Sequence, residues 1–132
     1  MITVALVDDD PMVRTGLNFI LKGEDGIDVA WQAGDGAEAL TKLRDRPVDV
    51  VLLDVRMPGL DGLATLEELR GWQTRPRVIV LTTFNTDDYV VRALKLGADA
   101  FLLKDADPAR LVEAIQQLPR SEERRVGKEC RS

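Results

Sequence analysis

Residues 50–59 read VVLLDVRMPG, and this stretch decides how the chain folds. Its four consecutive apolar residues predict a strand buried on both faces, as in a parallel sheet covered by helices. The run stops at Asp54, and Pro58-Gly59 then indicates a loop. The segment therefore predicts a buried scaffold that carries Asp54 to the edge of the sheet.

Four further β-rich runs lie on either side of this strand and alternate with segments whose apolar residues recur near the helical period. Strands that alternate with helices are typical of a parallel sheet with helices on both faces. The predicted fold class is therefore α/β, with a doubly wound five-stranded parallel sheet. In such sheets the functional crevice lies beyond the carboxyl ends of the strands. The predicted strands are residues 3–7, 27–33, 48–53, 78–81 and 100–103.

Several helix boundaries carry capping signals. Asp10 and Asp107 each precede a proline, which places a capping carboxylate before the first helical position. Thr86 is a candidate cap for the helix that follows the fourth strand, and Gly97 suits the left-handed backbone that ends this helix.

Composition narrows the class of protein. A chain of 132 residues with 45% hydrophobic residues is long enough for one core. The net charge of −5 argues against direct nucleic-acid binding, and no apolar run approaches the roughly 20 residues of a membrane span. The absence of histidine and the single cysteine, Cys130, argue against zinc sites, histidine catalysis and a disulfide framework. We expect a soluble, cytoplasmic domain.

Polar side chains follow four of the predicted strands. The first strand ends in Asp8 and Asp9, the third in Asp54, the fourth in Thr82 and the fifth in Lys104. Because the first and third strands are neighbours in such a sheet, Asp8 or Asp9 should approach Asp54. Crowded carboxylates repel one another unless a cation lies among them, and Mg²⁺ prefers oxygen ligands. The sequence therefore predicts a magnesium site at this edge.

Each of these residues has a simpler explanation when it is taken alone. A strand-end aspartate is more often a helix cap or a turn residue, a single lysine is usually a surface residue, and threonine is a common strand former. However, these polar residues all fall at the carboxyl ends of four strands, whereas chance would scatter polar groups over both edges of the sheet. A carboxylate nucleophile, a metal ion, an ammonium group and a hydroxyl together suit phosphoryl transfer onto Asp54.

Four segments match a known family in order and spacing: LVDDDPMVRTGL, VVLLDVRMPGLDGL, VIVLTTF and GADAFLLKD. Over residues 2–119 the chain resembles the receiver domain of bacterial response regulators, particularly the subgroup with a LuxR-type helix-turn-helix output domain. The resemblance implies a flavodoxin-like fold with strand order 2-1-3-4-5. It also implies a phosphorylation-dependent signalling switch, with self-catalysed phosphoryl transfer and slow autodephosphorylation only, rather than an enzyme.

The resemblance also assigns roles and partners. Asp54 is then the phosphoacceptor, and a sensor histidine kinase donates the phosphoryl group. The full-length protein would carry a DNA-binding output domain and form a homodimer on phosphorylation. The remaining roles are Asp8, Asp9, Asp54 and the backbone carbonyl of Arg56 as Mg²⁺ ligands, Thr82 and Lys104 as partners of the phosphoryl group, and Thr82 and Phe101 as switch residues.

Two other functions fit part of the pattern. A haloacid-dehalogenase-type phosphatase also forms an aspartyl-phosphate, but it needs Asp-x-Asp-Gly-Thr after its first strand, and VDDDPMV does not provide this. A receiver-like module that works as a binding surface without accepting phosphate is the second alternative. Turnover of a phosphomonoester would favour the phosphatase, whereas stoichiometric, Mg²⁺-dependent labelling favours the receiver domain.

Residues 120–132, RSEERRVGKECRS, differ in character from the rest of the chain. They contain one aliphatic residue, Val126, and resemble the translation of a common sequencing adapter. We therefore expect a receiver domain at residues 1–119, a non-native or disordered tail at residues 120–132, and an output domain missing from the chain. The alternative for the tail is an ordinary solvated, basic linker.

Overall fold

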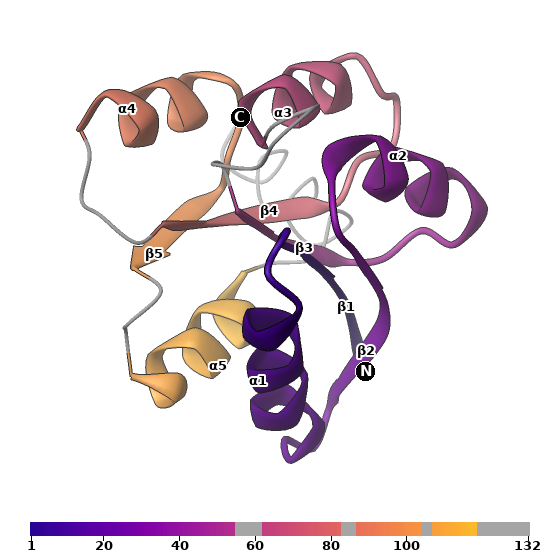
Figure 1. The fold of residues 1–132 in the computed structure, drawn as a ribbon, viewed down its shortest axis with the longest axis vertical. Coiled ribbons are helices and arrows are strands. Elements are labelled where there is room, and N and C mark those ends of the chain that lie inside the picture. Colours follow the sequence, from indigo (N-terminus) through magenta and orange to yellow (C-terminus); the bar gives the residue numbers. More distant parts are fainter. Residues whose placement is uncertain (55–61, 83–86, 104–106, 119–132) are drawn as a thin grey trace, which may run out of the picture.

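The structure, a computed structural model, describes residues 1–54, 62–82, 87–103 and 107–118. Five strands form one parallel sheet in the order β2-β1-β3-β4-β5 (Figure 1). The predicted doubly wound fold and its strand order are both confirmed. The strands are β1 (Ile2–Val7), β2 (Ile27–Ala33), β3 (Val50–Asp54), β4 (Arg77–Thr82) and β5 (Ala100–Leu103).

Helices cover both faces of the sheet. α1 and α5 pack against one face, and α2, α3 and α4 pack against the other (Figure 1). None of the helices in the described ranges is long and apolar enough to cross a bilayer. The helices are α1 (Pro11–Lys22), α2 (Gly36–Asp45), α3 (Gly62–Arg70), α4 (Asp87–Lys95) and α5 (Pro108–Gln117).

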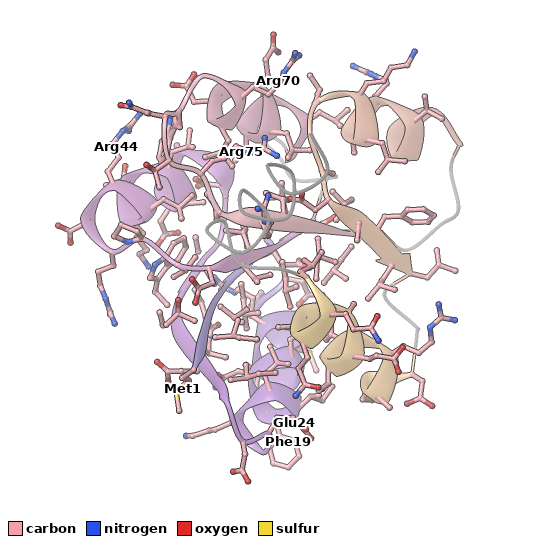
Figure 2. All side chains as sticks on the ribbon, turned by 180° about the vertical axis from the view of Figure 1, so that it is seen from behind. Met1, Phe19, Glu24, Arg44, Arg70 and Arg75 are labelled. Carbon is pink, nitrogen blue, oxygen red and sulfur yellow. The ribbon has the colours of Figure 1, made fainter. Side chains whose placement is uncertain are left out.

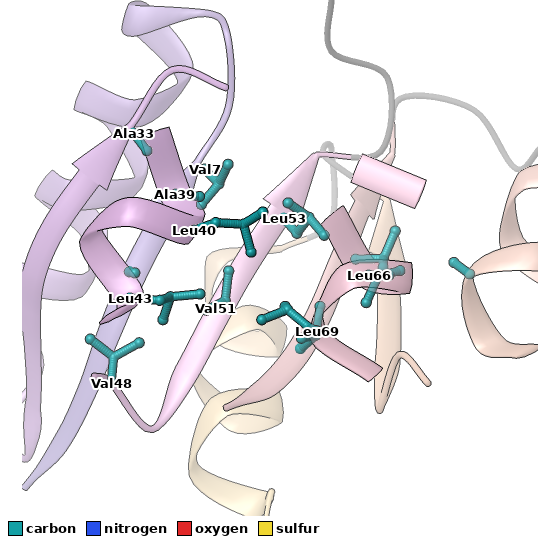
Figure 3. Close-up of a cluster of buried hydrophobic side chains, with 14 of the residues drawn as sticks. Val7, Ala33, Ala39, Leu40, Leu43, Val48, Val51, Leu53, Leu66 and Leu69 are labelled. Atoms are coloured by element: carbon teal, nitrogen blue, oxygen red, sulfur yellow. The ribbon is translucent and has the colours of Figure 1, made fainter. Parts of the chain in front are cut away.

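The central strand β3 serves two cores at once. Val51 and Leu53 pack with the residues beneath α2 and α3 (Figure 3). Val50 and Leu52 belong to the second cluster, beneath α1 and α5. Successive side chains of a strand point to opposite faces, so a strand covered on both sides must be apolar at every position. The unbroken apolar run before Asp54 follows from this double burial.

The predicted helix caps are confirmed where they fall within the described residues. The side chain of Asp10 accepts a hydrogen bond from the backbone of Met12, and that of Asp107 accepts one from Ala109. Gly97 has φ of +105°, and a Cβ atom there would lie 2.6 Å from an Arg75 guanidinium nitrogen. The backbone conformation therefore favours glycine at this position, whereas the Arg75 side chain could shift to make room for a Cβ atom. Thr86 lies outside the described residues.

The third strand differs from its prediction at both ends. β3 begins at Val50 rather than at residue 48, and just before it the Asp49 carboxylate accepts hydrogen bonds from the backbone N–H and the hydroxyl of Thr3 at 3.0 and 3.2 Å. At its other end, β3 includes Asp54, which pairs with Leu81 of β4. The phosphoacceptor candidate is thus held by regular sheet pairing and not by a loop.

Candidate functional site

Strand pairing brings the candidate carboxylates to one level of the sheet. Val7 of β1 pairs with Leu53 of β3, and each is followed directly by an aspartate, Asp8 or Asp54. Both aspartates are buried, with 2% and 4% of their surface exposed, whereas Asp9 is exposed. The edge thus presents two carboxylates from inside the fold and one from its surface.

The turn after β1 fixes the orientation of the first acidic residues. The backbone N–H of Asp8 donates to Ala33 at the end of β2, at 3.1 Å. One Asp8 carboxylate oxygen accepts a hydrogen bond from the backbone N–H of Asp10 at 2.9 Å. Asp10 itself caps α1, as the proline after it indicates. The three consecutive aspartates therefore have different environments, and Asp10 acts as a cap.

Asp8, Asp9 and Asp54 converge closely enough to share a cation. Each offers a carboxylate oxygen, and these oxygens all lie within 4.8 Å of one another. In an octahedral Mg²⁺ site with ligands at about 2.1 Å, opposite oxygens are about 4.2 Å apart. The three carboxylates are all hard oxygen donors, the class that Mg²⁺ prefers. The residues present therefore fit the predicted ion in both chemistry and spacing.

A fourth acidic side chain near this edge has partners of its own. Glu38, in the first turn of α2, accepts a hydrogen bond from the backbone N–H of Gly34 at 2.8 Å and pairs with Lys42 at 3.0 Å. The Gly34 N–H, followed by Lys42, lowers the pKa of the Glu38 carboxyl from its usual value of 4.5. Asp35 caps the same helix by accepting from the Glu38 backbone. This arrangement was not predicted. It differs from a capping box in that the Glu38 carboxylate accepts from the N–H of Gly34, one residue before the cap, and not from that of Asp35.

The remaining predicted site residues fall partly outside the described part of the chain. Thr82 is the last residue of β4 and pairs with Leu103, the last residue of β5. Phe101 lies on β5 with 38% of its surface exposed. Arg56 and Lys104 lie outside the described residues. The structure thus brings Asp8, Asp9 and Asp54 together and places the end of β4 at the same edge of the sheet.

Residues 4–116 match the family of response regulator receiver domains. The chain belongs to this family, which confirms the predicted class, and this class is not an enzyme family in the ordinary sense. It is 39% identical over 115 residues to the nitrate/nitrite response regulator protein NarL of Escherichia coli strain K12, over 87% of this chain and 53% of NarL. The chain spans about half the length of the curated relatives that it matches.

Solved structures agree with this assignment. The crystal structure of a LuxR-family two-component response regulator from Aurantimonas sp. SI85-9A1 has a TM-score of 0.82 and 31% identity, covering 88% of this chain and 83% of that chain. The CheX-CheY-BeF3-Mg²⁺ complex from Borrelia burgdorferi has a TM-score of 0.80 and 28% identity, covering 87% of each chain. The fold and the family likeness to LuxR-type regulators therefore rest on both sequence and structure.

Proposed function

We propose that Asp54 accepts a phosphoryl group from a sensor histidine kinase. The added charge would shift the domain between two conformations that present different surfaces to partners. The observation that carries the proposal is the convergence of Asp8, Asp9 and Asp54 within 4.8 Å at the carboxyl ends of β1 and β3. Regular pairing of Asp54 with Leu81 holds the acceptor in place before any reaction begins. Phosphoryl transfer depends mainly on such positioning and on neutralising charge.

In the proposed transfer, a carboxylate oxygen of Asp54 forms a bond to phosphorus while the bond between phosphorus and the kinase histidine nitrogen breaks. The imidazole leaves with the electron pair of that bond. Asp8, Asp9, Asp54 and the backbone carbonyl of Arg56 would hold Mg²⁺. When bound, the ion supplies positive charge beside the phosphoryl oxygens.

The proposed switch uses residues at the ends of β4 and β5. The Thr82 hydroxyl would donate to one phosphoryl oxygen, and the Lys104 ammonium would pair with another. Phe101, which is 38% exposed on β5, would turn inward into the space that Thr82 leaves. Inward rotation would change the surface formed by α4, β5 and α5, and with it the choice of partner.

We propose that the whole protein continues beyond residue 119 into a DNA-binding output domain, acts in the cytoplasm, and regulates transcription. The family likeness to NarL and to LuxR-family regulators supports this proposal. We further propose that residues 120–132 are foreign to the native protein, because they differ in character from the rest of the chain. Sequencing the source locus across codon 120 tests this, and genuine genomic continuation of RSEERRVGKECRS would contradict it.

The test of the acceptor is labelling with a small acyl-phosphate donor in the presence of Mg²⁺, followed by intact-mass spectrometry. We expect one phosphoryl group per wild-type chain and none on Asp54→Asn. The matched control is Asp10→Asn, which removes a charge from the same turn but keeps a good capping residue. This control should still be labelled.

Each result has a clear meaning. Labelling of Asp54→Asn at the wild-type level would exclude Asp54 as the acceptor. A wild-type chain that stays unlabelled while binding its partners would favour the phosphate-independent interaction module. Labelling that proceeds equally well after chelation of divalent ions would remove the role proposed for Asp8 and Asp9.

A further inference from the structure

Asp9 is the least firmly held of the three converging carboxylates. Asp54 is paired within the sheet, and Asp8 is buried with one carboxylate oxygen bonded to the backbone N–H of Asp10. Asp9 is exposed, and its side chain has no hydrogen bond or ion pair within the described part of the chain. Its position is therefore set by its backbone, which runs from the end of β1 into the first turn of α1.

The first turn of α1 has few contacts that could fix it against the sheet. Of residues 11–15 only Val13 and Arg14 are not exposed. Val13 borders an apolar cavity of about 60 Å³ between α1, α5 and the sheet, so packing on that side is loose. The outer face of the helix adds no support, since Phe19 is 80% exposed and lies at the edge of the molecule (Figure 2). Arg14 is left as the main inward contact of this turn.

The Arg14 side chain fills the seam between α1 and the turn that joins β2 to α2. A Cβ atom on Gly34 would lie 3.5 Å from a terminal guanidinium nitrogen of Arg14, so the side chain reaches from the helix to this turn. The same two turns are joined at their base, where the N–H of Asp8 donates to the carbonyl of Ala33 at 3.1 Å. Arg14 therefore spans, from the helix side, a gap that one backbone hydrogen bond closes from the sheet side.

Packing rather than hydrogen bonding keeps Arg14 in this seam. Its Nε atom is buried and has no hydrogen-bond partner in the described ranges. A buried donor without a partner is unfavourable, so contacts of the side chain with its neighbours must offset that loss. An arginine side chain can thus stabilise its surroundings through its stem and not only through its charge.

The charge of Arg14 forms no ion pair with the described residues either, although Asp10 lies one turn before it. Glu38, beyond Gly34, accepts from the Gly34 N–H and pairs with Lys42 instead. Those two partners lower the pKa of the Glu38 carboxyl most, and the Arg14 charge adds a smaller effect in the same direction. Arg14 therefore contributes volume and an unpaired positive charge to the seam.

We propose that Arg14 is a positioning residue for the cation site. Its side chain holds the turn between β1 and α1 against the Gly34 turn, and this keeps the Asp9 carboxylate beside Asp8 and Asp54. This role rests on the proposed cation site, and it names the side chain that orders the exposed ligand of that site. Arg14 itself does not touch the ion.

Positioning and charge predict opposite effects of Arg14 on Mg²⁺ affinity. Two cations repel, so loss of the Arg14 charge alone should make the acidic site bind Mg²⁺ more tightly. Loss of a side chain that orients a ligand should weaken binding instead. Arg14→Ala and Arg14→Met both remove the charge, but methionine keeps most of the length of the side chain and lacks the unpartnered donor. The difference between these two variants therefore measures positioning alone.

Calorimetric titration of the full chain with MgCl₂ provides the first measurement. We expect Arg14→Ala to bind Mg²⁺ about tenfold more weakly than the wild-type chain, in line with other residues that orient metal ligands. Arg14→Met should bind at least as tightly as the wild-type chain. Ile20→Ala is the matched control, because it removes packing from the other end of α1 and should leave Mg²⁺ affinity unchanged. Position 14 is only half-buried and alanine is a good helix former, so the variants should stay folded.

A double-mutant cycle tests whether Arg14 acts through Asp9. Asp9→Asn should itself weaken Mg²⁺ binding, and Arg14→Ala added to Asp9→Asn should cause no further loss. A further tenfold loss in the double variant, equal to that of Arg14→Ala alone, would overturn the proposed route through Asp9.

Hydrogen exchange in metal-free buffer gives a measurement that does not depend on the ion. The N–H groups of Asp10 and Arg14 are bonded across this turn, to the Asp8 carboxylate and to the Asp10 carbonyl. We expect Arg14→Ala to lose protection at both positions, whereas Arg14→Met should keep it.

Equal Mg²⁺ affinities for Arg14→Ala and Arg14→Met would overturn the proposal, whichever way both had changed. So would wild-type affinity or wild-type protection in Arg14→Ala, and a wild-type chain that binds no Mg²⁺ would overturn it together with the cation site. Labelling of Asp54 is measured at saturating Mg²⁺ in the same samples. An unlabelled wild-type chain whose Mg²⁺ affinity depends on Arg14 as expected would support the positioning role while contradicting the proposed acceptor, so the two proposals fail separately.

Discussion

Carboxylates at the two edges of the sheet have opposite kinds of neighbours. At the carboxyl ends of the strands, Asp8 and Asp54 converge with Asp9 until their oxygens lie within 4.8 Å of one another. At the amino ends, the Asp99 carboxylate lies 3.6 Å from the Arg77 guanidinium and 3.9 Å from that of Arg75. It also accepts a hydrogen bond from the backbone of Val78 at 2.9 Å.

Burial is similar in the two places, so the difference lies in the neighbours. Asp99 has 7% of its side chain exposed, against 2% and 4% exposure for Asp8 and Asp54. Two like charges at 4.8 Å repel by on the order of 3 kcal/mol at an effective dielectric constant of about 20. Asp99 lies beside cations of its own fold, whereas the three converging carboxylates form a site where an added cation would reduce their mutual repulsion.

The largest effect is expected at the amino edge. Asp99→Ala removes a carboxylate that lies beside the guanidinium groups of Arg75 and Arg77. Arg77 is buried and would lose this counter-charge. Breaking a buried ion pair in this way should lower the free energy of unfolding by about 3 kcal/mol. Urea denaturation followed by circular dichroism measures it.

The control for this change is Asp28→Ala, which removes an exposed aspartate from the edge strand β2. Its cost should stay within about 0.5 kcal/mol. Equal losses for Asp99→Ala and Asp28→Ala would mean that the amino-edge ion pairs contribute nothing specific.

Magnesium should stabilise the opposite edge. An ion that binds the assembled carboxylates and not the unfolded chain should raise the free energy of unfolding by about 2.7 kcal/mol at 100 times its dissociation constant. Asp54→Asn should lose most of this gain. Urea titrations with Mg²⁺ and after its removal by a chelator provide the measurement, and an unchanged midpoint for the wild-type chain would contradict a cation site formed by folding.

Removing one of the crowded charges should have the opposite sign to removing Asp99. In metal-free buffer, Asp8→Asn should raise the free energy of unfolding by about 1 kcal/mol, since repulsion falls while the amide oxygen can still accept from the Asp10 backbone. The same variant should respond less to Mg²⁺. A loss of stability as large as that of Asp99→Ala would show that the favourable interactions of the Asp8 carboxylate outweigh the repulsion.

The sequence predicted the carboxyl edge well because its information is local. Each strand is an apolar run, and each candidate residue follows its strand directly, so strand order alone brings Asp8 and Asp54 together. The Arg75–Asp99 contact could not be predicted in this way. Its members are 24 residues apart and meet only because the turn at Gly97 returns the chain alongside the start of β4.

The apolar face of α1 is predictable from the sequence as well, because Val13, Leu17 and Ile20 follow the helical period and line the space shared with α5. Met12 and Phe19 lie off that face by the same period, and both side chains are exposed. The roles of all the site residues remain predictions from the family resemblance, and Arg56 and Lys104 lie outside the described part of the chain.

The smallest expected effect comes from Glu38. Like Asp99, it has a cation and a backbone N–H as partners, but it lies close to the carboxyl edge of the sheet. Its lowered pKa means that the charged form is favoured in the folded state, so its contribution is present above pH 4.5 and is lost as the pH falls through the lower folded value. The side chain is 45% exposed and screened by solvent, so Glu38→Gln should cost only about 0.5 kcal/mol at pH 7. Because the neutral glutamic acid resembles glutamine, the difference from wild type should disappear once the pH has fallen below the lowered pKa of Glu38. Urea titrations at pH 7 and over a series of falling acidic pH values measure this, and a cost that persisted in acid would show that the contribution comes from packing and not from charge.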